Sequence, residues 1–252
     1  MKILVFLSTI IYFFVYFNKK TNVVNKMLLY LLNKKTQDID ALWQKIKNKY
    51  ENTSLVASLE DYVSASGKKN HEERMLVAIL LMESLGHMRC FNYECREPLT
   101  LEKYDIGKPY FTGTNLRLNI AHNEDFIVIA YAKFDEIGVD IESEIDKEKA
   151  EKTAKRFPQI DSLKTDQNGD GSIDEILAFE MLKEDTFTTL NLSKADNSFT
   201  AKWTAAEAIM KCDGRGFSAL GDLGNIKNSM SLLTFKTEKN DKKIYISLAT
   251  KR

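Results

Sequence analysis

Two short stretches of the chain carry acidic and basic residues at spacings that suit metal-assisted acid–base chemistry. In the first, Glu-Ile-Gly-Val-Asp-Ile-Glu at residues 136–142, Asp140 and Glu142 alternate with apolar residues. Alternate side chains of a strand share a face, so the two carboxylates would point together away from the core formed by their neighbours. Carboxylates held side by side repel each other and favour a cation between them. The stretch therefore predicts a cation site.

The second stretch supplies a third acid and a base. Trp203, Glu207 and Lys211 follow each other at intervals of four residues in Trp-Thr-Ala-Ala-Glu-Ala-Ile-Met-Lys. This spacing places all three side chains along one face of a helix, with the acid and the base one turn apart. The same spacing is typical of an exposed ion pair that stabilises a helix by roughly 0.3–0.5 kcal/mol. On spacing alone both interpretations stay open.

The elements that would position these residues follow from hydrophobic periodicity and turn signals. Helices are expected at 37–50, 72–86, 146–157 and 199–211, and residues 158–198 between the last two are expected to be polar and rich in loops. Strands are expected from Met27 onward, after the turn at 107, at 116–122 and 126–132, and around the acid pair. Residues 230–250 predict a terminal β-hairpin with Asn240 and Asp241 near its turn.

Composition limits the class of protein and its partners. The 252 residues are 44% hydrophobic, enough to bury a full core as one large domain or two small halves. The 36 Lys and Arg balance the 36 Asp and Glu, so a polyanion such as duplex DNA is not an expected partner. The three cysteines show no Cys-x-x-Cys spacing and leave an odd thiol, which favours a reducing compartment and a cytoplasmic location.

An apolar run at residues 3–17 offers an alternative location. It is shorter than the roughly 20 residues that span a bilayer, lacks a small-residue cleavage site, and has more positive charge after it than before it. Three interpretations stay open: a membrane anchor that is not cleaved, a segment packed on the domain, and a start assigned too early. Met27, which begins an expected strand, would be a natural start.

Four short motifs occur in a set order: Gly-Lys-Pro-Tyr-Phe from residue 107, Asn-Ile-Ala-His from 119, Ile-Gly-Val-Asp-Ile-Glu from 137, and the Trp203 helix. Together with the terminal hairpin, they resemble the 4′-phosphopantetheinyl transferases of the Sfp type over about residues 27–252. The resemblance implies Mg²⁺-dependent transfer of the phosphopantetheine arm of coenzyme A to a serine of an acyl or peptidyl carrier protein. It also implies a monomer.

The resemblance implies a fold and a set of catalytic residues. The expected fold is α+β, with two similar halves at 27–133 and 134–252 related by a pseudo-twofold axis and the active site in the cleft between them. Asp140, Glu142 and Glu207 match the acids that bind Mg²⁺, and Glu207 also matches the proposed base for the carrier serine. Lys211 matches a lysine that contacts phosphate and assists the leaving group.

Three further residues match contacts to coenzyme A. His122 matches the histidine of the family's Asn-Ile-Ser-His motif, which binds a phosphate of coenzyme A. Lys108 and Pro109 match the Gly-Lys/Arg-Pro loop on the nucleotide side. Two departures from the family pattern remove polar groups: Ala121 replaces the motif serine, and Ala206 replaces a lysine that usually precedes the helical glutamate. These losses favour weakened activity, or a family member that binds coenzyme A or carrier protein without turnover.

A second metal candidate lies in an insertion at residues 166–177. Asp166, Asn168, Asp170 and Asp174 occupy positions 1, 3, 5 and 9 of an EF-hand type of loop, whose oxygen ligands can wrap Ca²⁺. Position 12 is Leu177, where a bidentate acid is expected. Calcium binding and a plain acidic, solvated insertion both remain open.

Overall fold

The computed structural model describes residues 27–251, apart from 37, 52, 68–69, 90–98, 106, 134, 164, 166–175 and 184–185. The apolar run at 3–17 lies outside these residues, and so do the candidate calcium ligands Asp166, Asn168, Asp170 and Asp174. Among the described residues, no helix combines the length and the apolar character needed to cross a membrane.

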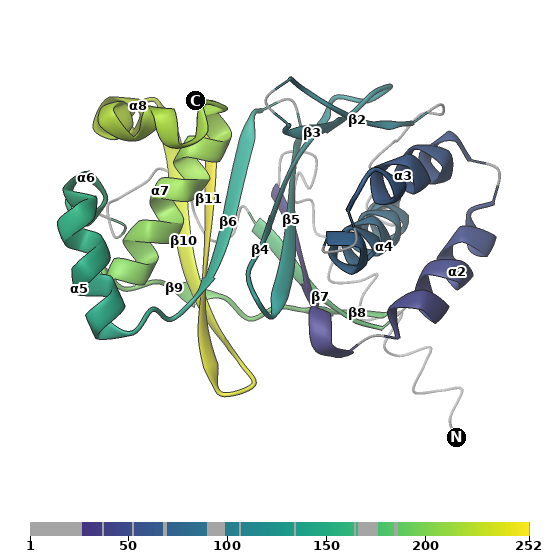
Figure 1. Cartoon of the computed structure of the whole chain (residues 1–252), viewed down its shortest axis with the longest axis horizontal. Helices are drawn as coiled ribbons and strands as arrows, with labels where there is room; N and C mark the ends of the chain where they lie inside the picture. The colour runs from purple at the N-terminus through teal and green to yellow at the C-terminus, as the bar shows by residue number, and fades with distance from the viewer. Residues whose placement is uncertain are drawn as a thin grey trace, which may run out of the picture.

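The chain is an α+β protein, as expected from its sequence, and its two main sheets lie between two groups of helices (Figure 1). The first sheet has the order β4 (Leu116–His122), β5 (Phe126–Lys133), β1 (Met27–Asn33), β7 (Ile176–Lys183) and β8 (Thr186–Thr189). The second has the order β6 (Ile137–Ser143), β11 (Lys242–Lys251), β10 (Met230–Lys239) and β9 (Ser193–Lys194). A short ribbon pairs β2 (Leu101–Lys103) with β3 (Pro109–Phe111).

The helices divide between the outer faces of the two sheets (Figure 1). Beside the first sheet lie α2 (Ile39–Lys49), α3 (Ser54–Ser64) and α4 (His71–Arg89), and the short 3-10 helix η2 (Lys34–Thr36) follows β1. Beside the second sheet lie α5 (Lys147–Arg156), α6 (Pro158–Asp161), α7 (Phe199–Asp213), the 3-10 helix η5 (Gly216–Asp222) and α8 (Leu223–Asn228).

Strand β1 shows why the layers stack in this order. All of its side chains from Leu28 to Leu32 are fully buried, so both faces of the strand are covered. Leu28, Tyr30 and Leu32 pack in a cluster that includes the buried face of α4, while Leu29 and Leu31 pack in a second cluster with residues of β6, β10 and β11. Successive strand residues point to opposite faces, so one strand joins the helical layer to the second sheet.

Most of the predicted elements are confirmed, and the main difference lies in residues 158–198. The sequence predicted a loop-rich stretch there, but β7 runs parallel to β1 in the first sheet and pairs with β8. Strands β7 and β8 therefore belong to the sheet built mainly from residues 27–133. The polar residues that flank β7 in the sequence made this strand difficult to recognise. Its buried side chains form a nearly continuous apolar run, which is typical of a central strand paired in parallel.

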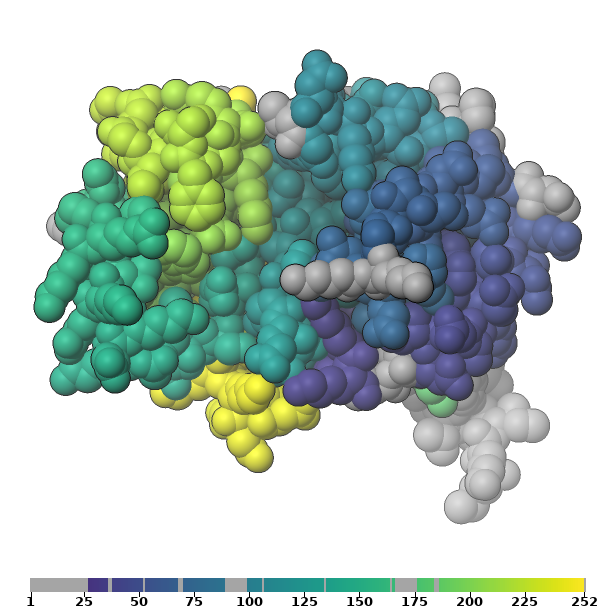
Figure 2. Space-filling model, in the orientation of Figure 1, coloured from purple at the N-terminus to yellow at the C-terminus, as the bar shows by residue number. Residues whose placement is uncertain are grey.

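The terminal hairpin is confirmed, and its tip reaches the first sheet. Asn240 and Asp241 have φ values of 52° and 59°, the left-handed conformation of a two-residue hairpin turn. Beside the turn, Lys242 contacts Asp125 at 2.6 Å, and Asp125 also pairs with Lys35 at 2.5 Å. Figure 2 shows the yellow tip projecting beside the purple N-terminal part of the described chain. The Lys242–Asp125 ion pair joins the two sheets at one end of the molecule.

Candidate functional site

The three predicted acids and Lys211 gather where β6 packs under α7. Strand β6 is the edge of the second sheet nearest to β4, and the Val139 N–H donates to Asn119 Oδ1 at 2.9 Å. Val139 and Ile141 face the core between the sheets, as predicted. Gly138, Asp140 and Glu142 occupy the opposite face, but this face is covered by α7 and is not open to solvent along its length. Asp140 is only 3% exposed.

Gly138 sets the distance between the strand and the helix. A Cβ atom at this position would lie far inside contact distance of the Ala208 carbonyl oxygen and the Cys212 backbone nitrogen. Only glycine allows the two backbones to approach this closely. The close approach brings the side chains of Glu207 and Lys211, on the neighbouring turns of α7, over the acid pair of β6.

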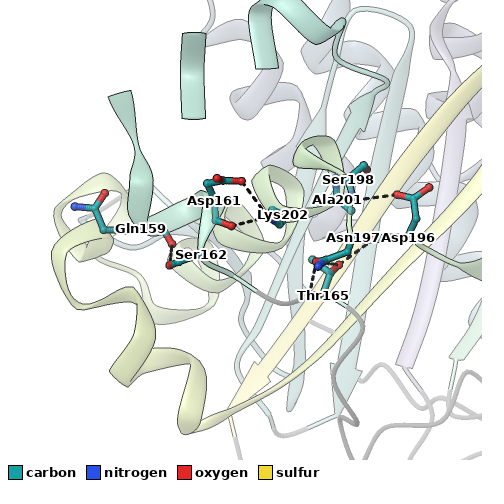
Figure 3. Close-up of polar contacts among 9 residues, drawn as sticks. All are labelled: Gln159, Asp161, Ser162, Thr165, Asp196, Asn197, Ser198, Ala201 and Lys202. Atoms are coloured by element: carbon teal, nitrogen blue, oxygen red, sulfur yellow. Dashed lines mark hydrogen bonds and ion pairs between the residues drawn. The ribbon is translucent and has the colours of Figure 1, made fainter. Parts of the chain in front are cut away.

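The N-terminal end of α7 is fixed by polar contacts that Figure 3 draws. Ser198 is the N-cap, and its side chain accepts a hydrogen bond from the Ala201 N–H at 3.3 Å. The Ser198 N–H donates to Asp196 Oδ1 at 3.1 Å. One turn into the helix, Lys202 Nζ donates to the Asp161 carbonyl oxygen at 2.5 Å and to its Oδ1 at 3.0 Å. These contacts hold the helix that carries Glu207 and Lys211.

The closest contact within the site joins Lys211 to Asp140. Lys211 Nζ donates to Asp140 Oδ1 at 2.6 Å, while its distance to Glu207 Oε2, one turn back on the helix, is 3.9 Å. Lys211 therefore contacts an acid of the strand more closely than its partner on the helix. Burial raises the pKa of Asp140, and the Lys211 ammonium opposes that rise.

Glu207 and Glu142 are crowded carboxyl groups that lack enough positive charge nearby. Burial, followed by the charge of Asp140, raises the pKa of each from 4.5 to about 7. A side-chain interaction with Asp140 adds to the rise in the pKa of Glu207, and an interaction with Trp203 lowers the pKa of Glu142. Trp203 therefore interacts with an acid of the strand, which the sequence did not predict.

The three acids provide an incomplete set of metal ligands. Asp140 Oδ2 is buried and accepts no hydrogen bond from the described residues, although such an oxygen is costly to leave without a partner. Across those residues, no group of three or more His, Cys, Asp or Glu side chains is arranged so that it could hold a metal ion by itself. Mg²⁺ uses one or two protein carboxylates together with substrate phosphates and waters, so Asp140 Oδ2 beside Glu142 or Glu207 fits such an ion.

His122 lies at the edge of the same charge cluster. The charges of Lys211 and Asp140 both act on its imidazole, whose pKa is lowered chiefly by burial. His122 Nε2 lies 3.1 Å from Glu73 Oε1, and Lys34 Nζ lies 2.6 Å from Glu73 Oε2. The structure therefore brings His122 together with the acids and the lysine, and adds Glu73 and Lys34, which the sequence did not single out.

Lys108 and Pro109 lie at the other end of β6. Lys108 Nζ donates to Glu136 Oε2 at 2.8 Å, directly before the strand begins, and the Lys108 side chain is only 10% exposed. At about 3.3 Å per residue, Glu136 lies about 13 Å along the strand from Asp140. Lys108 and Pro109, the predicted nucleotide contacts, are therefore distant from the acids. Only an extended ligand could contact both these two residues and Asp140.

Two alanines in the sequence motifs, Ala121 and Ala206, are buried in apolar clusters. Ala121 packs in the core between the sheets, on the strand face opposite His122. Ala206 is fully buried among side chains of α6 and α8. A serine at 121 would face apolar neighbours, and a lysine at 206 would bury a charge at a high cost. Within this fold, the two alanines are explained by packing.

Only weak signals in the sequence pointed to the residues that were missed. Glu73 lies in the first turn of a helix, where an acid is ordinarily explained by the helix dipole. Lys34 follows a strand in the pair Lys34-Lys35, which is ordinarily explained as a solvated turn. The tryptophan spacing on α7 placed Trp203 on the face of Glu207 but could not show that it would interact with Glu142.

A divalent cation is expected to stabilise the protein more at high pH than at low pH. Because the pKa values of Glu142 and Glu207 are about 7 in the folded protein, against 4.5 ordinarily, the folded protein binds more protons than the unfolded chain between these pH values. Without a cation, its free energy of unfolding therefore falls as the pH rises through this window. A cation relieves that cost and binds only the deprotonated carboxylates.

The measurement is the melting temperature with and without millimolar Mg²⁺ at pH 5.5 and pH 8. We expect a clear increase at pH 8, little at pH 5.5, and none in Asp140→Asn at either pH. An equal increase at both pH values, or one that persists in the variant, would show that the cation binds elsewhere.

No protein-family model matches this chain, and a search of curated proteins finds none that matches it.

Proposed function

We propose that the protein transfers the 4′-phosphopantetheine arm of coenzyme A to a serine of an acyl or peptidyl carrier protein, with Mg²⁺ as cofactor. The observation that carries this proposal is the convergence of Asp140, Glu142 and Glu207 with Lys211 across the packed faces of β6 and α7, with His122 beside them. These positions come from three separate sequence motifs. Their convergence supports a common chemical role.

Each residue has a task that its surroundings support. Glu207, with a pKa of about 7, is suited to take the proton of the carrier serine near neutral pH. The serine oxygen then forms a bond to the phosphorus that carries the pantetheine arm, and the bond from that phosphorus to the bridging pyrophosphate oxygen breaks, which releases 3′,5′-ADP. Lys211 stabilises the charge on the departing phosphate in this proposal.

Asp140 and Glu142, with Glu207, would hold the magnesium ion. When bound, the ion neutralises charge on the pyrophosphate. Asp140 offers the buried Oδ2 atom. His122 would contact a phosphate of coenzyme A, and Lys108 with Pro109 would contact the nucleotide at the far end of β6.

The proposal extends to the architecture and setting of the protein. We infer two similar halves related by a pseudo-twofold axis, with coenzyme A bound between them, and a monomer as the working state. The fully buried, free thiol of Cys212 agrees with a reducing compartment, so we place this activity in the cytoplasm. Calcium binding by residues 166–177 stays a separate prediction.

A second candidate is a protein that binds coenzyme A or a carrier protein without turnover. The observation that favours it is the 2.6 Å contact between Lys211 and Asp140, which engages both the proposed phosphate ligand and the proposed metal ligand. If that ion pair persisted with ligand bound, binding would remain possible while transfer would not.

The test is transfer from a fluorescent coenzyme A to a panel of apo carrier proteins by the full chain with Mg²⁺. Labelling of a carrier serine that disappears with EDTA would support the transferase. If no carrier is labelled while calorimetry still detects coenzyme A binding, the second candidate replaces it.

A further inference from the structure

One carboxylate in the site bridges two donors that could otherwise hold an anion. The two oxygens of Glu73 are divided between partners: Oε2 lies 2.6 Å from Lys34 Nζ and Oε1 lies 3.1 Å from His122 Nε2. The partners come from distant parts of the chain, since Lys34 follows β1 and His122 ends β4. Two nitrogen donors that converge on the two oxygens of one carboxylate can hold two oxygens of a phosphate group in the same way.

Lys34 is fixed in place independently of Glu73. Its ammonium also donates to the Asn123 carbonyl oxygen at 2.7 Å, and its side chain is only 15% exposed. Asn123 is in turn held in the β4–β5 turn, where its Oδ1 accepts from the N–H groups of Asp125 and Phe126 at 3.0 and 2.9 Å. The ammonium would therefore stay close to His122 if Glu73 moved away.

The Glu73 side chain can move away from Lys34 and His122. Its side chain is 31% exposed, and it stands in the first turn of α4. A carboxylate near a helix N-terminus is stabilised by the helix dipole wherever its rotamer places it within that turn. Release from Lys34 and His122 would therefore leave the charge in a favourable position.

We propose that Glu73 is an internal competitor for the anion site formed by Lys34 and His122, and that a phosphate or pyrophosphate group binds there only after displacing it. This inference rests on the proposed function, because it concerns the site at which His122 would meet coenzyme A. Glu73 lowers the apparent affinity for the anion by the fraction of time that it occupies the donors. Ligands that contribute binding energy elsewhere overcome this competition, whereas free phosphate binds the wild type only weakly.

The opposite role for Glu73 makes the opposite prediction. If the carboxylate only tethered α4 or oriented His122 for its ligand, its removal would weaken anion binding or leave it unchanged. If it competes, its removal strengthens binding. The sign of the change in affinity therefore separates the two roles.

The experiment measures the Kd for inorganic phosphate by calorimetry for the full-length wild type, Glu73→Ala, and the control Glu72→Ala. Glu72 is an exposed acid of the same helix turn, so its removal changes the net charge equally. We expect Glu73→Ala to bind phosphate at least about tenfold more tightly than wild type, the control to change less than threefold, and Lys34→Met added to Glu73→Ala to abolish the gain. No gain, an equal gain in the control, or no binding by any variant would overturn the proposal.

Two further arms extend the result. If Glu73→Ala folds poorly, Glu73→Gln keeps the side-chain shape without the charge and must show a gain of the same sign. A gain for coenzyme A but not for dephospho-coenzyme A assigns the site to the 3′-phosphate, and an equal gain for both assigns it to the pyrophosphate. Carrier labelling by the wild type tests the proposed function separately: a phosphate gain without labelling keeps the competitor role and overturns the transferase.

Discussion

Replacing Glu207 by glutamine is expected to lower carrier transfer by about 100-fold to 10,000-fold, the usual contribution of a positioned general base. Glutamine keeps the shape of the side chain but cannot accept the serine proton. The pKa of Glu207, raised to about 7 by burial and by the charge of Asp140, suits this role near neutral pH. The measurement is the initial rate of carrier labelling at saturating coenzyme A, together with the Kd for coenzyme A by calorimetry.

Binding of coenzyme A should change far less than transfer, because the proposed nucleotide and phosphate contacts lie on other residues. Glu151→Gln is a matched control: it neutralises an exposed glutamate of α5 that lies 3.9 Å from Lys147. That variant should keep the wild-type rate. Full transfer by Glu207→Gln would remove Glu207 as the base, and a parallel loss in both variants would point to net charge and not to the site.

Sequence periodicity predicted the orientation of the acid pair, Asp140 and Glu142, but not its surroundings. Alternation along residues 136–142 placed Val139 and Ile141 in a core and the two acids on the opposite face, and the structure agrees. Periodicity could not show that this face lies beneath α7, where Asp140 is almost fully buried. What covers a strand face is decided by tertiary packing, here through Gly138, and packing partners distant in sequence leave no local pattern.

Electrostatic partners were the least predictable feature of the site. The sequence paired Glu207 with Lys211 through helical spacing, yet the shorter contact of Lys211 is to Asp140, 71 residues away along the chain. The contacts of Glu73 on α4 were equally unpredictable, because Lys34 follows β1 and His122 ends β4. Spacing within one element predicts only neighbours on that element.

The strand β7 illustrates a different limit. Its apolar residues are enclosed by polar stretches, and a parallel partner such as β1 requires a crossover from a distant part of the chain. No local turn sequence predicts the parallel pairing of β7 with β1. The terminal hairpin differs, because Asn240 and Asp241 indicated its turn directly.

Gly138→Ala is expected to disrupt the site as strongly as the loss of a catalytic group. The added methyl group would overlap the Ala208 carbonyl oxygen and the Cys212 nitrogen, both backbone atoms that no side-chain rotation can move. The helix must shift away from β6, which separates Lys211 and Glu207 from Asp140. Overpacking of this kind typically costs about 1–3 kcal/mol, which corresponds to a decrease of roughly 2–12 °C in melting temperature for a chain of this size.

The control for this variant is Gly224→Ala, because a methyl group at this α8 position would meet nothing within 4 Å. Alanine is also favoured over glycine within a helix, so the control should melt at or slightly above the wild-type temperature. Carrier labelling should fall at least about 100-fold in Gly138→Ala and remain unchanged in Gly224→Ala. If Gly138→Ala kept both its melting temperature and its transfer rate, the close packing of α7 on β6 would not be what assembles the site.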